Sequence, residues 1–472
     1  MLRYTRQLDP NLIARRVLAL VDPHGTWDKA SAVRQHISDS VLLPAGNVLL
    51  AAARGDSHVS PNCTILPPIH DHALSDTLDR ARPLWDARTG IGFNLSFTSD
   101  PVATLRTLAA ACEESRRTSH DNYARGNMAV LSLWHPRLEE FVNCKQTASL
   151  CDELRTFNVS VAVSDFDSDK LTDSSEWKFA DSSEWKFEET ASWLNNQRLL
   201  SIVQAARKTG CPGVMFPMWV NKAVGSHTAN LYGQVTTLVP CGEQGMHDNE
   251  SCTLGALNLA ADALRSGTAP YINPLINDEK LAAAAAAGVA LLDKLVDVTR
   301  IGGDSCYNAK TLQTTLALRR IGLGVTGWAD ALEIAGLPYD SEEAVAEADR
   351  VARVYTAAAR DASKALHKGS GRFNVSTTCI QPTGNLSSVF GVRGYSIEPF
   401  FEQATSIGTD AHLNMLRAWQ RHVDTGVSKT VNMPADSSME DVASAFASAY
   451  ANAVKSVTVY VDHSRVGQPI VL

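Results

Sequence analysis

Strand-like and helix-like patterns alternate along this chain from about residue 60 to about residue 460. The segment from Phe157 to Val163 alternates as a strand does, whereas residues 279–299 are rich in alanine and leucine, as helices are. Such alternation predicts an α/β fold with parallel strands. Residues 1–40 read as a helical lead-in, and residues 41–472 read as the main α/β domain.

Two cysteines and a carboxylate stand close together in the middle of the chain. Cys241 lies between a proline and a glycine, Glu243 follows two positions later, and Cys252 comes eleven positions after Cys241. Proline fixes φ and glycine frees it, so Cys241 is expected at the tip of a tight loop. The chain has no CxxC pair, so this spacing is not that of a zinc ribbon.

The neighbouring carboxylate limits what Cys241 can do. A negative charge raises the pKa of a thiol and makes it a poor nucleophile, which disfavours acyl transfer. A neutral S–H can still give up and take back a hydrogen atom, so one-electron chemistry fits better. On Cys241 alone, a buried and inert cysteine in a Gly-Pro turn is an equally good interpretation.

Composition limits the partners and the compartment. The net charge of the 472 residues is −8, which argues against general binding to nucleic acid or to a membrane surface. No stretch resembles a signal peptide or a membrane span. The nine cysteines are scattered, so we expect a reducing, cytoplasmic location, where a reversible cysteine pair can work.

A second candidate site is the stretch Pro382-Thr383-Gly384-Asn385-Leu386. Its small hydroxyl and glycine residues stand at an expected helix start, where free backbone N–H groups favour a phosphate. An ordinary capped turn is the alternative interpretation.

The stretch around Cys241 resembles the active-site finger loop of ribonucleotide reductases. The family pattern is close to Asn-Pro-Cys-Gly-Glu, followed by Glu-Ser-Cys-Asn-Leu-Gly at the same spacing. Here the two parts begin at Val239 and Glu250. The resemblance covers roughly residues 40–465 and implies a ten-stranded α/β barrel with a central finger loop that carries the radical cysteine, preceded by a short helical segment. One departure is that Val239 replaces the family asparagine.

The resemblance also implies site residues. Cys241 would form a thiyl radical that removes the 3′ hydrogen atom of the ribose, and Glu243 would act as the general base on the 3′-OH. Cys63, in a Cys-x-x-x-Pro strand, would be the disulfide partner of Cys252. Residues implied to contact the substrate are Pro382, Thr383, Gly384, Asn385 and Leu386 at the phosphates, with Gly46, Val239 and Asn158 elsewhere.

The end of the chain resembles the adenosylcobalamin-dependent, class II branch of the family. Residues 428–434 and 456–465 are the segments that show this resemblance. The chain also has no Tyr-Tyr pair, which class I large subunits need for radical transfer. Homolysis of the cobalt–carbon bond would yield the 5′-deoxyadenosyl radical that oxidises Cys241. Asp410-Ala411-His412 begins a cobalamin motif but lacks its glycine, and we interpret it as chance. No protein ligand to a metal is predicted.

The implied partners are a ribonucleoside di- or triphosphate and a thioredoxin-like protein or small thiol as reductant, because no tail with two nearby cysteines ends the sequence. Two alternatives stay open: a related radical enzyme acting on a different nucleotide, and a paralogue that binds nucleotides without reducing them. Only Phe97 to Pro101 stand where the family has a long effector-binding loop. We therefore expect weak or absent effector control, no N-terminal ATP-binding domain, and a monomer or homodimer.

Overall fold

The computed structural model describes residues 9–119, 126–164, 186–267, 275–300 and 306–464. The chain forms two compact units, each built from distant parts of the sequence. Unit 1 comprises residues 1–62, 251–404 and 421–424, and unit 2 comprises residues 63–250, 405–420 and 425–472.

Unit 1 is built on a three-stranded sheet with β9 (Ser251–Asn258) in the centre. β10 (Ile321–Thr326) pairs with β9 in parallel, and β1 (Leu42–Pro44) pairs with it in antiparallel orientation. Every residue of β9 is buried. Every residue of β10 is buried as well, so both strands are covered on both faces, as strands in the interior of α/β proteins are.

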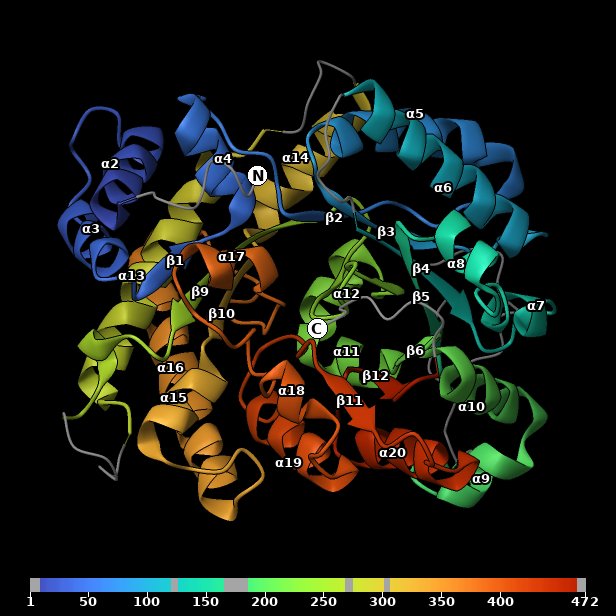
Figure 1. Ribbon diagram of the computed structural model, residues 1–472. Coiled ribbons are helices and arrows are strands. Elements are labelled where there is room, and N and C mark those ends of the chain that lie inside the picture. The colour runs from blue at the N-terminus through green and yellow to red at the C-terminus, as the bar shows by residue number, and fades with distance from the viewer. Residues whose placement is uncertain (1–8, 120–125, 165–185, 268–274, 301–305, 465–472) are drawn as a thin grey trace. The chain divides into compact units, whose positions relative to one another are not determined.

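Two long helices, α13 and α16, pack against each other in unit 1, and α13 lies on β9 and β10 (Figure 1). The helices of unit 1 are α2 (Pro10–Val21), α3 (Ala30–Ser38), α4 (Gly46–Arg54), α13 (Asp278–Asp297), α14 (Cys306–Leu318), α15 (Trp328–Ala335), α16 (Glu342–His367), α17 (Gly384–Val389) and α18 (Phe401–Ala404), with a 3-10 turn at η4 (Asp262–Leu264).

Unit 2 contains a seven-stranded sheet in the order β2-β3-β4-β5-β6-β12-β11. The strands are β2 (Cys63–Ile65), β3 (Gly90–Asn94), β4 (Asn127–Ser132), β5 (Phe157–Ala162), β6 (Gly213–Met215), β12 (Ser456–Val461) and β11 (Thr430–Met433). β2 to β6 run parallel to one another, and β12 is antiparallel to β6. A separate two-stranded hairpin joins β7 (Thr237–Leu238) and β8 (Gly245–Met246).

Helices connect successive strands of unit 2, as the α/β pattern predicts. They are η1 (Asp71–Ala73), α5 (Leu74–Asp86), α6 (Pro101–Thr118), α7 (Leu138–Val142), α8 (Ala148–Glu153), α9 (Thr190–Asn195), α10 (Gln197–Thr209), α11 (Pro217–Val224), α12 (Ser226–Tyr232), α19 (Thr409–Gln420) and α20 (Met439–Ala451). α5 and α6 lie side by side on the outer side of β3 (Figure 1).

Several helix and strand predictions are confirmed. α13 covers nearly the range expected from its alanine and leucine content, and β5 covers the alternating segment. α6 begins at Pro101 directly after the short link from Phe97, because the side chain of Asp100 accepts a hydrogen bond from the backbone N–H of Ala103 and caps the helix.

The expectation of parallel strands needs a correction at two places. β1 and β12 are antiparallel to β9 and β6, and the sequence alternation of helices and strands did not reveal these pairings. The two sheets together contain ten strands, the number expected of the barrel. Among the described residues, no helix is both long and apolar enough to cross a bilayer.

Candidate active site

The hairpin of β7 and β8 presents the Cys241 segment at its tip. The loop closes on itself, because the backbone N–H of Val239 donates to the carbonyl of Gln244 at 2.9 Å and the N–H of Gly242 donates to the carbonyl of Val239 at 2.9 Å. Gly242 has a φ of +79°, a conformation that favours glycine over other residues. The predicted tight loop tip is confirmed.

Glycines in β3 let this hairpin approach the sheet of unit 2. A Cβ atom placed on Gly92 would lie 2.3 Å from the carbonyl oxygen of Leu238, and one on Gly90 would lie 2.8 Å from Cγ of Pro240. Leu238 also packs in an apolar cluster with Met128 and Ala162 of β4 and β5. The hairpin therefore rests directly on the parallel strands.

Three hydrogen bonds from distant parts of unit 2 hold the loop tip. The Asn158 side chain donates to the carbonyl of Pro240 at 2.7 Å, and Ser456 Oγ donates to the carbonyl of Gly242 at 2.8 Å. The backbone N–H of Gly426 donates to the carbonyl of Glu243 at 2.7 Å. The resemblance implied Asn158 as a substrate contact, and in the structure its amide supports the loop.

The Cys241 side chain is exposed at the tip of the loop. Surrounding protein atoms nevertheless displace much of the bulk water from its vicinity. This desolvation, followed by the charge of Glu243, raises the pKa of the Cys241 thiol well above its ordinary value. The thiol is therefore a protonated, accessible S–H group at neutral pH.

Glu243 is almost completely buried, with 2% of its surface exposed. Burial disfavours the charged carboxylate and raises the pKa of Glu243 to about 7. Its Oε2 atom has no hydrogen-bond partner among the residues that the structure describes. A carboxyl group that is half ionised near neutral pH can both accept and return a proton.

The other predicted residue of the loop, Val239, is fully buried. Its side chain does not reach solvent, and its backbone N–H and carbonyl make the two hydrogen bonds that close the loop.

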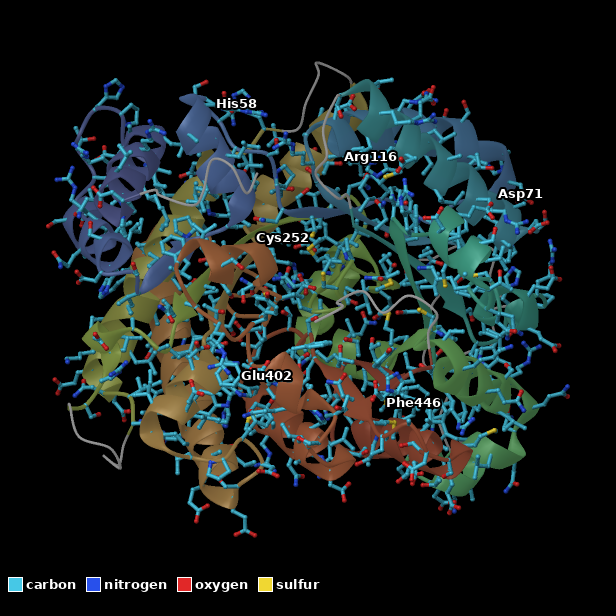
Figure 2. All side chains as sticks on the ribbon, viewed as in Figure 1. His58, Asp71, Arg116, Cys252, Glu402 and Phe446 are labelled. Carbon is cyan, nitrogen blue, oxygen red and sulfur yellow. The ribbon has the colours of Figure 1, made fainter. Side chains whose placement is uncertain are left out.

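Cys63 is half-buried and is the first residue of β2, opposite Gly90 of β3. A Cβ on Gly90 would lie 3.1 Å from Sγ of Cys63 and 2.8 Å from Pro240, so the Cys63 thiol and the finger loop lie over the same glycine. Cys252, labelled in Figure 2, is the second residue of β9 and is 1% exposed. Its carbonyl accepts a hydrogen bond from the N–H of Asn62 at 3.0 Å.

The phosphate candidate lies in unit 1, and its predicted helix start is confirmed because α17 begins at Gly384. Thr383 is buried, and its hydroxyl lies 2.7 Å from those of both Thr326 and Ser387 instead of capping the helix. Pro382 is exposed and Leu386 is half-buried, whereas the side chain of Asn385 lies outside the described residues. Gly46 begins α4 in the same unit.

Sequence reasoning missed Thr326, Gly426 and Ser456. Each contacts a predicted site segment that is far away in the chain, so no local motif signals its role. No group of three or more His, Cys, Asp and Glu side chains suited to a metal ion occurs in the described part of the chain. His412 of the partial cobalamin motif is fully buried in α19. Residue 465, the last of the class II segment, lies outside the described residues.

The chain is similar to known ribonucleotide reductases in sequence. The model of the family "ribonucleotide reductase, barrel domain" matches residues 62–378 and 394–460. A vitamin B12-dependent ribonucleoside-diphosphate reductase of Mycobacterium tuberculosis is 30% identical, over 86% of this chain and 68% of that protein. One from Thermoplasma acidophilum is 25% identical, over 83% of this chain and 57% of that protein.

The fold is similar to that of a solved structure as well. The class Id ribonucleotide reductase alpha subunit of Actinobacillus ureae matches with a TM-score of 0.73, covering 98% of this chain and 96% of that chain at 15% identity. This match confirms the predicted fold class. The family match spans most of the chain and includes the finger loop, β2 and β9, and by these matches the chain belongs to the ribonucleotide reductase family.

Proposed function

We propose that this chain reduces ribonucleotides to 2′-deoxyribonucleotides by a thiyl-radical mechanism with adenosylcobalamin as cofactor. The observation that supports it most is the finger loop, which presents an accessible, protonated thiol two residues from a buried carboxyl group with a pKa near 7. The mycobacterial and archaeal relatives are both named vitamin B12-dependent reductases.

Cys241 is the hydrogen-atom abstractor in this proposal. When bound, adenosylcobalamin would supply the one-electron oxidant for the thiol. This chemistry fits the residues present, because a thiol must keep its proton to exchange a hydrogen atom, and the raised pKa of Cys241 keeps it protonated. The thiyl radical then removes the 3′ hydrogen atom of the ribose and returns one at the end of turnover.

Glu243 takes the proton of the 3′-OH as the 2′-OH leaves as water. Its orphan Oε2 atom is suited to accept that proton, because no protein donor among the described residues competes for it. Burial keeps its pKa close to the operating pH, where general acid–base catalysis is most efficient.

Cys63 and Cys252 supply the two electrons in our proposal. Their two thiols lose two hydrogens and form one disulfide bond, while the ribonucleotide loses its 2′ oxygen as water. A thioredoxin-like protein or a small thiol then reduces the disulfide by exchange, which is favoured in the reducing cytoplasm.

The substrate phosphates bind at Pro382 to Leu386 in this proposal, with Gly46 and Asn158 as further contacts. The buried hydroxyl contacts of Thr383 give that segment a defined backbone. In this proposal, residues 1–40 form a helical lead-in and residues 41–472 form the catalytic domain. The protein acts as a monomer or a homodimer.

The replacement at Val239 favours an alternative in which the substrate differs. A fully buried valine offers no hydrogen bond to ribose hydroxyls, unlike the family asparagine. The alternative functions are a radical enzyme that acts on another nucleotide and a paralogue that only binds nucleotides.

The deciding experiment incubates the protein with adenosylcobalamin, dithiothreitol and each ribonucleoside di- and triphosphate in turn. We expect deoxyribonucleotide and cob(II)alamin without a second protein subunit. Turnover only with an iron or manganese partner protein would reject the cofactor assignment, and binding without turnover would favour the paralogue.

A further inference from the structure

Asn62 directly precedes Cys63 and is bonded to β9 through both its backbone and its side chain. Its backbone N–H donates to the carbonyl of Cys252 at 3.0 Å. Its side-chain oxygen accepts from the backbone N–H of Leu254 at 2.9 Å. These two bonds hold Asn62 opposite the segment that contains the second cysteine.

The Asn62 carboxamide is itself held in one orientation. Its Nδ2 donates to Oδ1 of Asn47 at 2.9 Å, and the Nδ2 of Asn47 donates to the carbonyl of Ser60. A flipped Asn62 would point its NH2 group at the N–H of Leu254, so each carboxamide fits in only one way. Asn47 is the second residue of α4, which ties this short chain of hydrogen bonds to a helix.

The same two segments are bonded again on the other side of the cysteines. The backbone N–H of Ile65 donates to the carbonyl of Glu250 at 2.9 Å, and that of Asn249 donates to the carbonyl of Ile65 at 2.9 Å. Cys63 stands between the bonded residues Asn62 and Ile65. Because successive Cα atoms are about 3.8 Å apart, the backbone of Cys63 cannot move far from residues fixed on both sides.

We infer that Asn62 is a positioning residue that sets the approach of Cys63 to Cys252. This inference rests on the redox role that the proposed function gives to the two cysteines. A disulfide needs its two Cα atoms to lie roughly 4.4–6.8 Å apart. Even a small loss of backbone order at Cys63 therefore makes formation of the disulfide less favourable. Asn62 therefore raises the effective concentration of one thiol toward the other.

The test measures the thiol–disulfide equilibrium of the full-length protein in mixtures of reduced and oxidised dithiothreitol. Thiols are trapped by alkylation, and the peptide that contains the Cys63–Cys252 disulfide is quantified by mass spectrometry. No nucleotide or cofactor is needed, so the result does not depend on turnover. The variants are Asn62→Ala, Asn47→Ala and, as the control, Asn258→Ala.

Asn258 is a matched control because it makes the same kinds of bonds at the other end of β9. Its Nδ2 donates to the carbonyl of Ser40 at 3.1 Å, and its Oδ1 accepts from the N–H of Ala260 at 3.1 Å. We expect Asn62→Ala to lower the equilibrium constant for disulfide formation about tenfold, a rise of about 30 mV in reduction potential. Asn47→Ala should shift it less in the same direction, and Asn258→Ala should stay within about twofold of wild type.

An unchanged constant in folded Asn62→Ala would overturn the inference and leave the cysteine pairing intact. An equal shift in Asn258→Ala would overturn it too, because general loosening of β9 would then explain the effect. If Asn62→Ala does not fold, Asn47→Ala decides in the same way. A wild-type protein that forms no Cys63–Cys252 disulfide would instead reject the pairing in the proposed function.

Discussion

At the scale of single residues, Cys241 and Glu243 lie two positions apart in one loop but differ in solvent exposure. The thiol is exposed at the tip, whereas the carboxyl group two positions later is buried with one oxygen unpaired in the described part of the chain. The Cys241 sulfur, the proposed hydrogen-atom abstractor, is therefore accessible from solvent. The Glu243 carboxyl group, the proposed general base, is shielded from bulk water, which sets its pKa near neutrality.

Cys241→Ser should abolish deoxyribonucleotide formation, because an alcohol O–H does not give up its hydrogen atom as a thiol does. The loss should exceed about 10³-fold, since the thiyl is the only hydrogen abstractor proposed. Cys151→Ser is the matched control, because its sulfur donates to the carbonyl of Lys145 at 3.0 Å, a bond that serine can keep. Activity of Cys241→Ser equal to that of the control would refute the mechanism.

Glu243→Gln should lower the turnover rate by about 10² to 10⁴, the usual contribution of a general base. Because a base must be ionised, the wild-type rate should rise with pH and level off above a pKa of about 7. The pH dependence of the single-turnover rate checks this. A wild-type rate that does not change between pH 5.5 and 8, about 1.5 units below and 1 unit above the pKa, would contradict the assignment of Glu243 as the general base.

The same carboxyl group should make folding stability depend on pH. Its pKa is about 7 in the folded state, against 4.5 for an ordinary glutamate side chain, so between these values the folded state binds more protons than the unfolded state. Stability from this group is therefore greatest below the unfolded pKa and falls by up to roughly 3 kcal/mol as pH rises through 7. Urea denaturation at several pH values should show this fall in wild type, and Glu243→Gln should lack it.

At the scale of elements, two glycines of β3 decide where the finger hairpin lies. The Cβ of an alanine at position 92 would meet the carbonyl oxygen of Leu238 at 2.3 Å and the side chain of Ile65 at 2.4 Å. A backbone atom cannot move aside as a flexible side chain does. The hairpin can rest on β3 only because Gly92 has no side chain.

Gly92→Ala should therefore push β7 away from the sheet and reduce activity more than stability. Overpacking costs about 1–3 kcal/mol, and displacement of the reacting thiol by about 1 Å can cost about 10² in rate. Gly408→Ala is the control, because a Cβ there would meet no atom within 4 Å. Urea denaturation and turnover of both variants separate the two effects, and full activity in Gly92→Ala would show that the hairpin is held elsewhere.

At the scale of the whole molecule, the short link before α6 bears on regulation. Asp100 caps this helix immediately after Phe97 to Ser99, so no long loop stands there. We expect each deoxynucleoside triphosphate to change the rate or the substrate preference less than tenfold, or about 1.4 kcal/mol of coupling. Rates with and without each effector test this, and a larger change would reveal an effector site elsewhere.

The sequence by itself determined the fold class, the position of the finger loop and the choice of the groups that we propose to react. Helix periodicity, capping residues and the Pro-Cys-Gly tip each depend on residues that are close together in the sequence. Such features can therefore be recognised without knowing the fold. It also indicated α13, β5 and the start of α17, because each pattern lies within one element.

Only the tertiary structure decided which distant groups hold the site. Ser456 and Gly426 reach the loop from about 180 to 215 positions away, and Thr326 reaches Thr383 across 57 positions. The antiparallel pairing of β1 and β12 and the buried surroundings that shift the Glu243 pKa have the same origin. Hydrogen bonds and desolvation depend on neighbours in space, which the chain meets only when it has folded.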